Sequence, residues 1–315
     1  MKPLDTQNIA TTVSNCASLA ALLEVSAYPK PGNIHRLNDF PETIYEHFLA
    51  GGVSLGPVMG ELALRGHRSH DLAEVRLGQG IKEAVDAMFR WQKGGNIHLG
   101  TILLFSPLSA AAGAILSDCR VEIQELRDYT SRIIANATPL DSIDIYAAIG
   151  KAMSSENLGT TDALDVTDND SSERIKRENI TPLEIFKLCK DRDLICHEWV
   201  TGFKTVFETG YPYLKEKIMS GSKINNATVG TFIKLLSENP DSLITRKTGT
   251  ESAQQVSEKA NQIIEAGGAE SEEGKTMLWS LDEELRKEEG RLNPGTIADL
   301  TAASLYVLLL SGWRP

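Results

Sequence analysis

The sequence predicts an all-α protein in which many helices pack around one or two fully apolar helices, with residues 1–315 forming a single domain. Apolar residues recur at helical spacing along most of the chain. No stretch shows a sustained alternation of apolar and polar residues, and no hairpin signal is present. Residues 99–117 and 300–313 contain no charged side chain, which is typical of helices that are buried on every side.

Helical patterns separated by proline, glycine and charged segments define the elements in order. Gly52, Gly56 and Gly60 give the second helix a smooth face that allows close packing. Residues 154–172 hold five acidic residues and no Lys or Arg, so this segment is a candidate for a long functional loop. The expected helices cover residues 5–28, a segment that starts within 39–42, then 80–92, 99–117, 122–136, 141–153, a segment that starts at 181, then 198–208, 227–238, 252–266, 276–289 and 293–310.

The composition excludes several classes of protein. The chain is 41% hydrophobic and 24% charged, as in ordinary globular proteins. Its net charge of −11 argues against a nonspecific nucleic-acid binder. Residues 99–117 approach the ~20 residues that a membrane span needs, but Pro107 and many small residues interrupt the segment. No signal peptide is evident, so we expect a soluble cytoplasmic protein without a membrane span.

The cysteines give a similar indication. They form no Cys-x-x-Cys pair and show no metal-ligand spacing. Such isolated cysteines are typical of reduced, mostly buried thiols in a cytoplasmic protein. The sequence therefore predicts four unpaired thiols, at Cys16, Cys119, Cys189 and Cys196.

The stretch 24–38 holds the strongest candidate site. No Walker loop, dinucleotide fingerprint, zinc-protease motif or nucleophile elbow occurs in the chain. Instead, two prolines stiffen the backbone on either side of Lys30, and Gly32 allows a turn or the close approach of a ligand. An ordinary interhelical turn with solvated charges is the alternative interpretation. The polar side chains that follow the turn are Asn33, His35 and Arg36.

The tetrapeptide Gly-Asn-Ile-His at 32–35 recurs at 95–98, again between two apolar segments. Lys30 and Arg36 suit phosphate oxygens, lysine as a point charge and arginine as a planar fork. Both histidines, His35 and His98, could act as acid or base near neutral pH. Each histidine could instead cap a helix or join two helices by a hydrogen bond.

Other polar residues stand out by their position. Asp162 and Asp165 lie three residues apart, and carboxylate oxygens suit a Mg²⁺ ion that also binds a polyphosphate. Arg246 and Lys247 form a second cationic turn. Asp299 lies within an apolar helix, where an aspartate requires a partner. The alternative for Asp162 and Asp165 is a solvated acidic loop, and the alternative for Asp299 is a structural ion pair.

Three segments in this order resemble the triphosphoribosyl-dephospho-coenzyme A synthase family, which serves the assembly of the citrate lyase and malonate decarboxylase prosthetic groups. They are Glu-Val-Ser-Ala-Tyr-Pro-Lys-Pro-Gly-Asn at 24–33, Gly-Asn-Ile-His at 95–98 and Asn-Pro-Gly-Thr-Ile-Ala-Asp-Leu at 293–300. The resemblance implies an all-α enzyme that uses ATP as a substrate. A ribose hydroxyl of dephospho-coenzyme A attacks the anomeric carbon of ATP, adenine leaves, and the triphosphate stays on the transferred sugar.

The resemblance also implies roles for particular residues. Asn96 and His98 would lie beside the reacting sugar. Asp299, Asp39 or the pair Asp162 and Asp165 would hold Mg²⁺ or serve as the base. The residues expected to contact the nucleotide are Lys30, Gly32, Asn33, Arg36, Arg246, Lys247 and Asn293.

The chain departs from the family pattern at three places, so its acceptor could differ from dephospho-coenzyme A. Leu-Asn-Asp-Phe at 37–40 replaces a Gly-x-His-x-Asp-Met element, residues 158–165 replace an Arg-Gly-Glu-Ala-type loop, and Leu99 stands where lysine is usual. Another nucleotide- or phosphosugar-dependent enzyme of cofactor biosynthesis is therefore an alternative. A non-catalytic helical binding protein is a second alternative.

The enzyme interpretation requires that the turns near positions 30, 98 and 299 meet in one cavity. The expected partners are small-molecule substrates, ATP and dephospho-coenzyme A or a related acceptor. A homo-oligomer is also possible, because nothing in the sequence specifies the oligomeric state.

Overall fold

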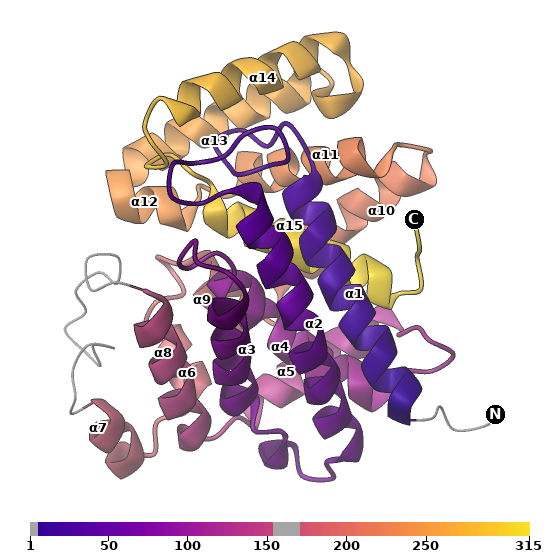
Figure 1. Ribbon diagram of the computed structural model, residues 1–315, viewed down its shortest axis with the longest axis vertical. Helices are drawn as coiled ribbons and strands as arrows, with labels where there is room; N and C mark the ends of the chain where they lie inside the picture. The colour runs from indigo at the N-terminus through magenta and orange to yellow at the C-terminus, as the bar shows by residue number, and fades with distance from the viewer. Residues whose placement is uncertain (1–5, 154–170) are drawn as a thin grey trace.

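The computed structural model describes residues 6–153 and 171–315, and within these ranges every secondary-structure element is a helix (Figure 1). The all-α prediction is therefore confirmed for the described residues. The α-helices are α1 Thr6–Ser26, α2 Tyr45–Arg68, α3 Leu77–Trp91, α4 Leu99–Ile115, α5 Ile123–Ala135, α6 Pro139–Ala152, α7 Ser171–Glu178, α8 Pro182–Lys187, α9 Leu194–Thr201, α10 Tyr211–Met219, α11 Ile224–Glu238, α12 Ser242–Thr248, α13 Thr250–Glu265, α14 Glu272–Arg286 and α15 Gly295–Leu310. Short turns of other helix types occur at Leu72–Val75, Val206–Gly210 and Gly268–Glu270.

Two almost entirely apolar helices, α4 and α15, form the centre of the molecule, as the sequence predicts. Helix α15 crosses the middle of Figure 1 and packs against α1, α4 and α11. From Thr296 to Leu310 every residue of α15 is buried except Asp299. Helix α4 is buried in the same way from Thr101 to Gly113. Asp299 is thus the one residue between Thr296 and Leu310 that is not buried, and it carries a carboxyl group.

Glycines bring the N-terminal helices into close contact. A Cβ atom on Gly56 of α2 would lie 2.4 Å from Ser18 Oγ of α1, and one on Gly60 would lie 2.8 Å from the carbonyl oxygen of Ala10. These distances leave no room for a side chain, so the expected close packing of the glycine face is confirmed. Of the described helices, α1 alone has the length and apolarity of a membrane span, and 44% of its most apolar window is buried.

Three local expectations about the backbone are wrong. Helix α2 begins at Tyr45 rather than within 39–42, although Asp39 Oδ1 does accept a hydrogen bond from Tyr45 N at 2.7 Å. The continuous helix expected over 198–208 is interrupted, because Gly202 takes a left-handed conformation (φ 65°) that ends α9. Residues Arg246 and Lys247 lie in helix α12 rather than in a turn.

The expectation of four unpaired cysteines is also wrong. Cys189 and Cys196 form a disulfide across the turn between α8 and α9. Cys16 and Cys119 are free, the first buried and the second exposed. The sequence gives no sign of the bond, because the two cysteines are seven positions apart and no known spacing pattern covers them.

The segment after α1 is fixed by a buried ion pair. Lys30 Nζ donates to Glu24 Oε1 in the last turns of α1, and both side chains are buried. Burial lowers the pKa of Lys30 and raises the pKa of Glu24, while the attraction between the two groups opposes both shifts. Tyr28 is held in addition by Asn225 of α11, through hydrogen bonds of 3.1 and 2.9 Å. The chain that leads to Asn33 is thereby tied to two helices.

We expect Lys30→Ala to lower the free energy of unfolding by about 3–5 kcal/mol, because it leaves the Glu24 carboxylate buried without a partner. Lys275→Ala removes an exposed partner of Glu272 and should change stability by less than about 1 kcal/mol. Urea unfolding followed by circular dichroism measures both. The double variant Glu24→Gln/Lys30→Met should recover most of the loss, and equal effects of the two single variants would contradict the structural role.

Candidate active site

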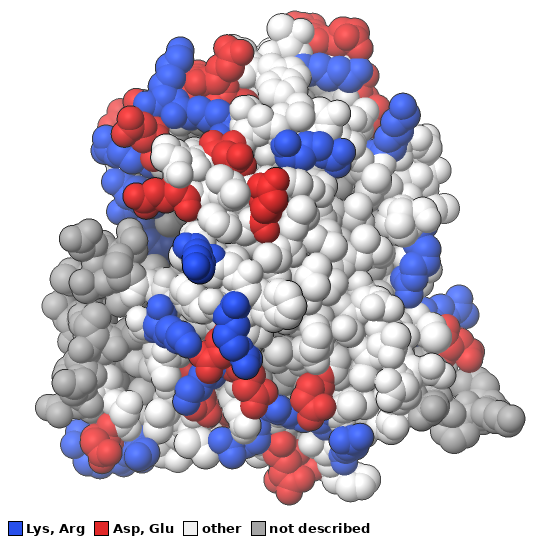
Figure 2. Space-filling model, in the orientation of Figure 1, with Lys and Arg blue, Asp and Glu red and all other residues white. Residues whose placement is uncertain are grey.

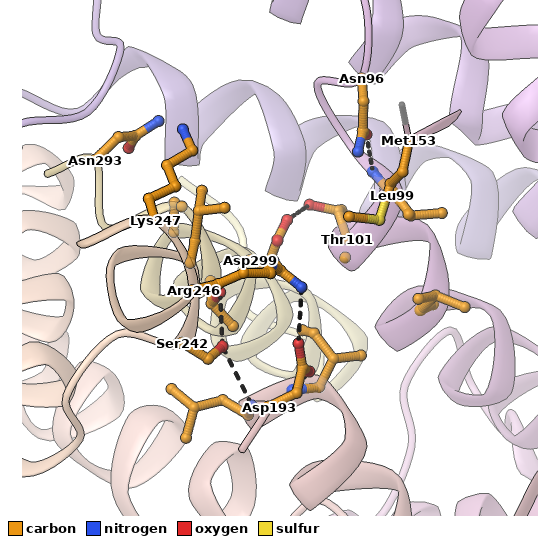
Figure 3. A pocket seen from close by; sticks show the side chains of 18 of the residues that line it. Asn96, Leu99, Thr101, Met153, Asp193, Ser242, Arg246, Lys247, Asn293 and Asp299 are labelled. Carbon is orange, nitrogen blue, oxygen red and sulfur yellow. Dashed lines mark hydrogen bonds and ion pairs between the residues drawn. The ribbon is translucent and has the colours of Figure 1, made fainter. Parts of the chain in front are cut away.

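A cavity of about 1780 Å³ opens between the two halves of the chain. Pockets that hold one drug-sized ligand usually measure about 300–1,000 Å³, so this cavity has room for two nucleotide-sized substrates. Its walls come from the segment after α1, the turn before α4, the end of α6, the turn between α8 and α9, helix α12 and the start of α15. Figure 3 shows the central part of this cavity, with Asp299 in the middle of the labelled side chains.

The two Gly-Asn-Ile-His segments form similar turns at the cavity wall. Gly32 and Gly95 both have positive φ, 71° and 78°, a conformation that favours glycine. In each turn the asparagine lines the cavity. Asn33 Nδ2 donates to Asn293 Oδ1 at 2.9 Å, whereas Asn96 Oδ1 accepts from the backbone N of Leu99 at 3.1 Å and so caps α4.

The two histidines that end these segments have different surroundings. His98 lines the cavity, and its Nε2 donates to the carbonyl oxygen of Phe48 at 3.2 Å. Burial lowers the pKa of His98 to about 4, so the ring is neutral at physiological pH and Nδ1 is left as an acceptor. His35 does not line the cavity. It is fully buried against Asp282, with 3.3 Å between Nε2 and Oδ2.

Asp299 is a cavity-lining carboxyl group whose pKa lies well above its usual value. Its Oδ1 accepts a hydrogen bond from Thr101 Oγ1 at 2.5 Å, and it faces the cavity from the otherwise buried helix α15. Burial raises the pKa of Asp299 to about 7, and the nearby charge of Glu24 acts in the same direction. A Cβ atom on Gly100 would lie 2.1 Å from Asp299 Oδ2, so only glycine at this position leaves space for the carboxylate.

A second buried carboxylate fixes helix α12 against α15. Asp241 Oδ1 accepts hydrogen bonds from the backbone N of Leu243 and Ile244, and Oδ2 accepts one from Ile297 N at 2.8 Å. Burial raises the pKa of Asp241 to about 6. Because one side chain caps α12 and binds the first turn of α15, the residues on these two helices keep a fixed relative position.

Helix α12 brings two cations to the cavity. Arg246 Nη1 lies 3.6 Å from Asp193 Oδ2, a residue of the turn before α9, and Lys247 Nζ donates to the carbonyl oxygen of Gly290 at 3.0 Å. Both side chains line the cavity and are shown in Figure 3. Burial lowers the pKa of Lys247, and the neighbouring Arg246 charge adds to this effect. Two neighbouring cations at a cavity wall suit an anionic ligand.

The segment that carries Asn33 is held from the outside by helix α14. Asp282 accepts hydrogen bonds from Gly32 N at 2.9 Å and from Asn38 Nδ2 at 3.0 Å. Arg286, one turn further along α14, donates to Asp282 and to the carbonyl oxygen of Asn33. Although burial acts to raise the pKa of Asp282, the hydrogen bonds from its neighbours keep it below its usual value.

The structure brings together most, but not all, of the expected site residues. Those that line the cavity are Asn33, Asn96, His98, Arg246, Lys247, Asn293 and Asp299. Those described residues that do not line it are Lys30, Gly32, His35, Arg36 and Asp39. Asp162 and Asp165 lie outside the described residues. The expected meeting of the turns near positions 30, 98 and 299 is therefore confirmed, with Asn33 in place of Lys30.

The basic residues of the first turn make internal contacts. Lys30 is completely buried, and the exposed Arg36 donates from Nε to the carbonyl oxygen of Ser26 at 2.6 Å. Among the described residues, no group of three His, Cys, Asp or Glu side chains could hold a metal ion. Sequence reasoning missed the Asp282–Arg286 pair, whose only signal is the i, i+4 spacing of opposite charges on a predicted helix.

Comparisons with known proteins identify the family of the chain. A family model described as ATP:dephospho-CoA triphosphoribosyl transferase matches residues 10–315. A protein of Stutzerimonas stutzeri (strain A1501), named "Probable 2-(5''-triphosphoribosyl)-3'-dephosphocoenzyme-A synthase", is 26% identical over 95% of this chain and 91% of its own length. A protein of the same name from Vibrio cholerae serotype O1 (strain M66-2) is 24% identical over 96% of this chain and 89% of its own length.

A solved structure has a similar fold. The crystal structure ascribed to a triphosphoribosyl-dephospho-CoA synthase of Archaeoglobus fulgidus matches with a TM-score of 0.64 and 28% identity, over 84% of this chain and 100% of its own. The family match over nearly the whole chain confirms the resemblance carried by the three sequence segments. This protein belongs to the ATP:dephospho-CoA triphosphoribosyl transferase family.

Proposed function

We propose that this protein transfers the triphosphoribosyl group of ATP to a ribose hydroxyl of dephospho-coenzyme A and releases adenine. Family membership supports the reaction, and the size of the cavity suits two nucleotide substrates. The observation that carries the proposal is the Asp299 carboxyl group, whose pKa of about 7 and position on the cavity wall suit proton transfer at neutral pH. A non-catalytic binding protein predicts no cleft that joins the polar turns, so the cavity disfavours it.

In the proposed reaction the acceptor oxygen bonds to the anomeric carbon of ATP as the bond from that carbon to adenine breaks. One proton leaves the acceptor hydroxyl and one is gained by adenine, so no net proton is consumed. Asp299 accepts the hydroxyl proton. Its carboxylate also favours the positive charge that develops on the sugar, as in glycoside chemistry. The amides of Asn33, Asn96 and Asn293 line the cavity, and we assign them to hydrogen bonds with the two sugars.

The neutral state of His98 restricts its role. With a pKa of about 4, the ring cannot donate a second proton to adenine near pH 7. It can accept a hydrogen bond at Nδ1, because Nε2 already donates to Phe48. We therefore assign His98 to orienting a substrate hydroxyl or amino group rather than to general acid catalysis.

The triphosphate is assigned to the cations of α12. Arg246 and Lys247 line the cavity beside Asn293, whereas Lys30 and Arg36 make internal contacts and receive structural roles. Mg²⁺ would neutralise part of the triphosphate charge. The cavity carboxylates fit an ion that arrives bound to ATP and needs one or two further ligands, and Asp193 beside Arg246 is the nearest candidate. The assignment of Asp162 and Asp165 to Mg²⁺ rests on the sequence alone, and so does the cytoplasmic location.

The proposed reaction predicts that incubation with ATP, Mg²⁺ and dephospho-coenzyme A yields free adenine and no ADP or AMP. Adenine should form in a one-to-one ratio with the modified acceptor, because each transfer breaks one bond to the base. Chromatography of the products measures the ratio. Release of ADP or AMP instead of adenine would favour another nucleotide-dependent reaction on the same scaffold.

We expect Asp299→Asn to lower kcat/KM by about 10²–10⁴, the usual contribution of a general base. In the unchanged protein the pKa of about 7 should give an acid limb. Activity depends on the ionised form, so kcat/KM falls about tenfold per pH unit below pH 7. Adenine release between pH 5 and 9 measures this profile. A profile without an acid limb, or one that the variant retains, would argue against Asp299 as the base.

Lys247→Ala should raise the KM for ATP about tenfold or more, since a charge-assisted hydrogen bond contributes about 1.5–3 kcal/mol. The KM for dephospho-coenzyme A should stay within about twofold. Lys223→Ala removes a lysine from the start of α11, away from the cavity, and is the matched control. Initial rates at varied concentrations of each substrate separate the two constants, and a larger effect on the acceptor would reverse the assignment of α12.

A further inference from the structure

The cavity is chemically divided, and Asp299 lies at the division. In Figure 3 Lys247 and Asn293 lie on one side of Asp299, and Leu99 and Met153 lie on the other. The second side continues as an apolar surface along the end of α6 and the length of α8. We call this surface the apolar wall; its residues are Ile149, Ala152, Met153, Ile185, Phe186 and Leu188.

Leu188 is the most exposed member of the apolar wall. It is 57% exposed in the free protein, although it lines the cavity directly after α8. Lys190 and Arg192 follow in the same turn and line the cavity, as do Asp191 and Asp193, the second of which faces Arg246 of α12. The Cys189–Cys196 disulfide closes the turn that carries the two cations, and Leu188 directly precedes that turn. An exposed apolar residue at a cavity wall, next to cations, fits a ligand with both an apolar and an anionic part.

The two substrates of the proposed reaction differ in this respect. In ATP every part beyond the adenosine is a phosphate, which suits α12. Dephospho-coenzyme A carries an adenosine, a diphosphate and a long uncharged pantetheine arm with a dimethyl group and a terminal thiol. An arm of this kind loses unfavourable contact with water when it lies on apolar side chains, and its diphosphate matches the cations that follow Leu188.

On the basis of the proposed function, we propose that the apolar wall is the binding subsite for the pantetheine arm of the acceptor, with Lys190 and Arg192 beside the acceptor diphosphate. The acceptor then enters from the side of α6 and α8, and ATP from the side of α12. Their reacting sugars meet at Asp299, between the two sides. The chain thereby selects a pantetheine-bearing nucleotide rather than any nucleotide with a free ribose hydroxyl.

The variant Leu188→Glu tests this subsite, because it replaces an apolar contact by an anion next to the acceptor diphosphate. We expect the KM for dephospho-coenzyme A to rise about tenfold or more, the scale of one lost leucine contact, with the KM for ATP within about twofold. Leu140→Glu is the matched control, since Leu140 is a 45% exposed leucine at the start of α6 that does not line the cavity. Equal thermal midpoints of the two variants exclude a folding defect as the cause.

A fragment of the acceptor gives an independent readout. 4′-Phosphopantetheine should inhibit competitively against dephospho-coenzyme A but not against ATP, and Leu188→Glu should abolish this inhibition. Competition with ATP, or a rise only in the KM for ATP, would overturn the proposal and place the ATP base on the wall. Calorimetry with 4′-phosphopantetheine alone reports binding even if the unchanged protein releases no adenine, so a failure of the proposed reaction is distinguished from a failure of the subsite.

Discussion

The centre of the fold is stabilised by the burial of apolar side chains, and Asp299 brings a carboxyl group into the same environment. Its neighbours on the helix are buried, and desolvation disfavours the charged carboxylate. The fold accommodates the group with one hydrogen bond from Thr101 and with the space left by Gly100. The result is a carboxyl group that gains and loses its proton near pH 7. The environment of Asp299 therefore connects the packing of α4 and α15 with the proposed chemistry.

The walls of the cavity depend on carboxylates that bind backbone groups of distant segments. Asp282 holds the turn that carries Asn33, and Asp241 joins α12 to α15. Both side chains are fully buried, so their hydrogen bonds form in a low-dielectric environment, which makes them strong. In the same environment the loss of a hydrogen-bond partner is unfavourable. These two side chains therefore fix the positions of segments that are far apart in the sequence. The face of the molecule in Figure 2 shows acidic and basic side chains interspersed, so the net charge of −11 is not gathered there into one patch.

The helices could be predicted because apolar periodicity reports directly on burial, and α4 and α15, whose sequences are almost entirely apolar, form the buried centre. The family segments identified Asn33, His98 and Asp299 as neighbours. The sequence places Lys30 at the nucleotide, whereas the structure buries it against Glu24. A lysine between two prolines gives no sign that its partner lies in the preceding helix. The Asp282–Arg286 pair was missed for a related reason, since it acts on a turn about 250 positions away.

The contacts that complete the cavity join very remote parts of the chain. Gly32 and Asp282 are 250 positions apart, Asn33 and Asn293 are 260 apart, and Thr101 and Asp299 are 198 apart. Closing loops of this length requires a loss of chain entropy that local helical contacts do not require. During folding the individual helices can therefore form early, whereas the cavity is completed only when the first and last segments have met.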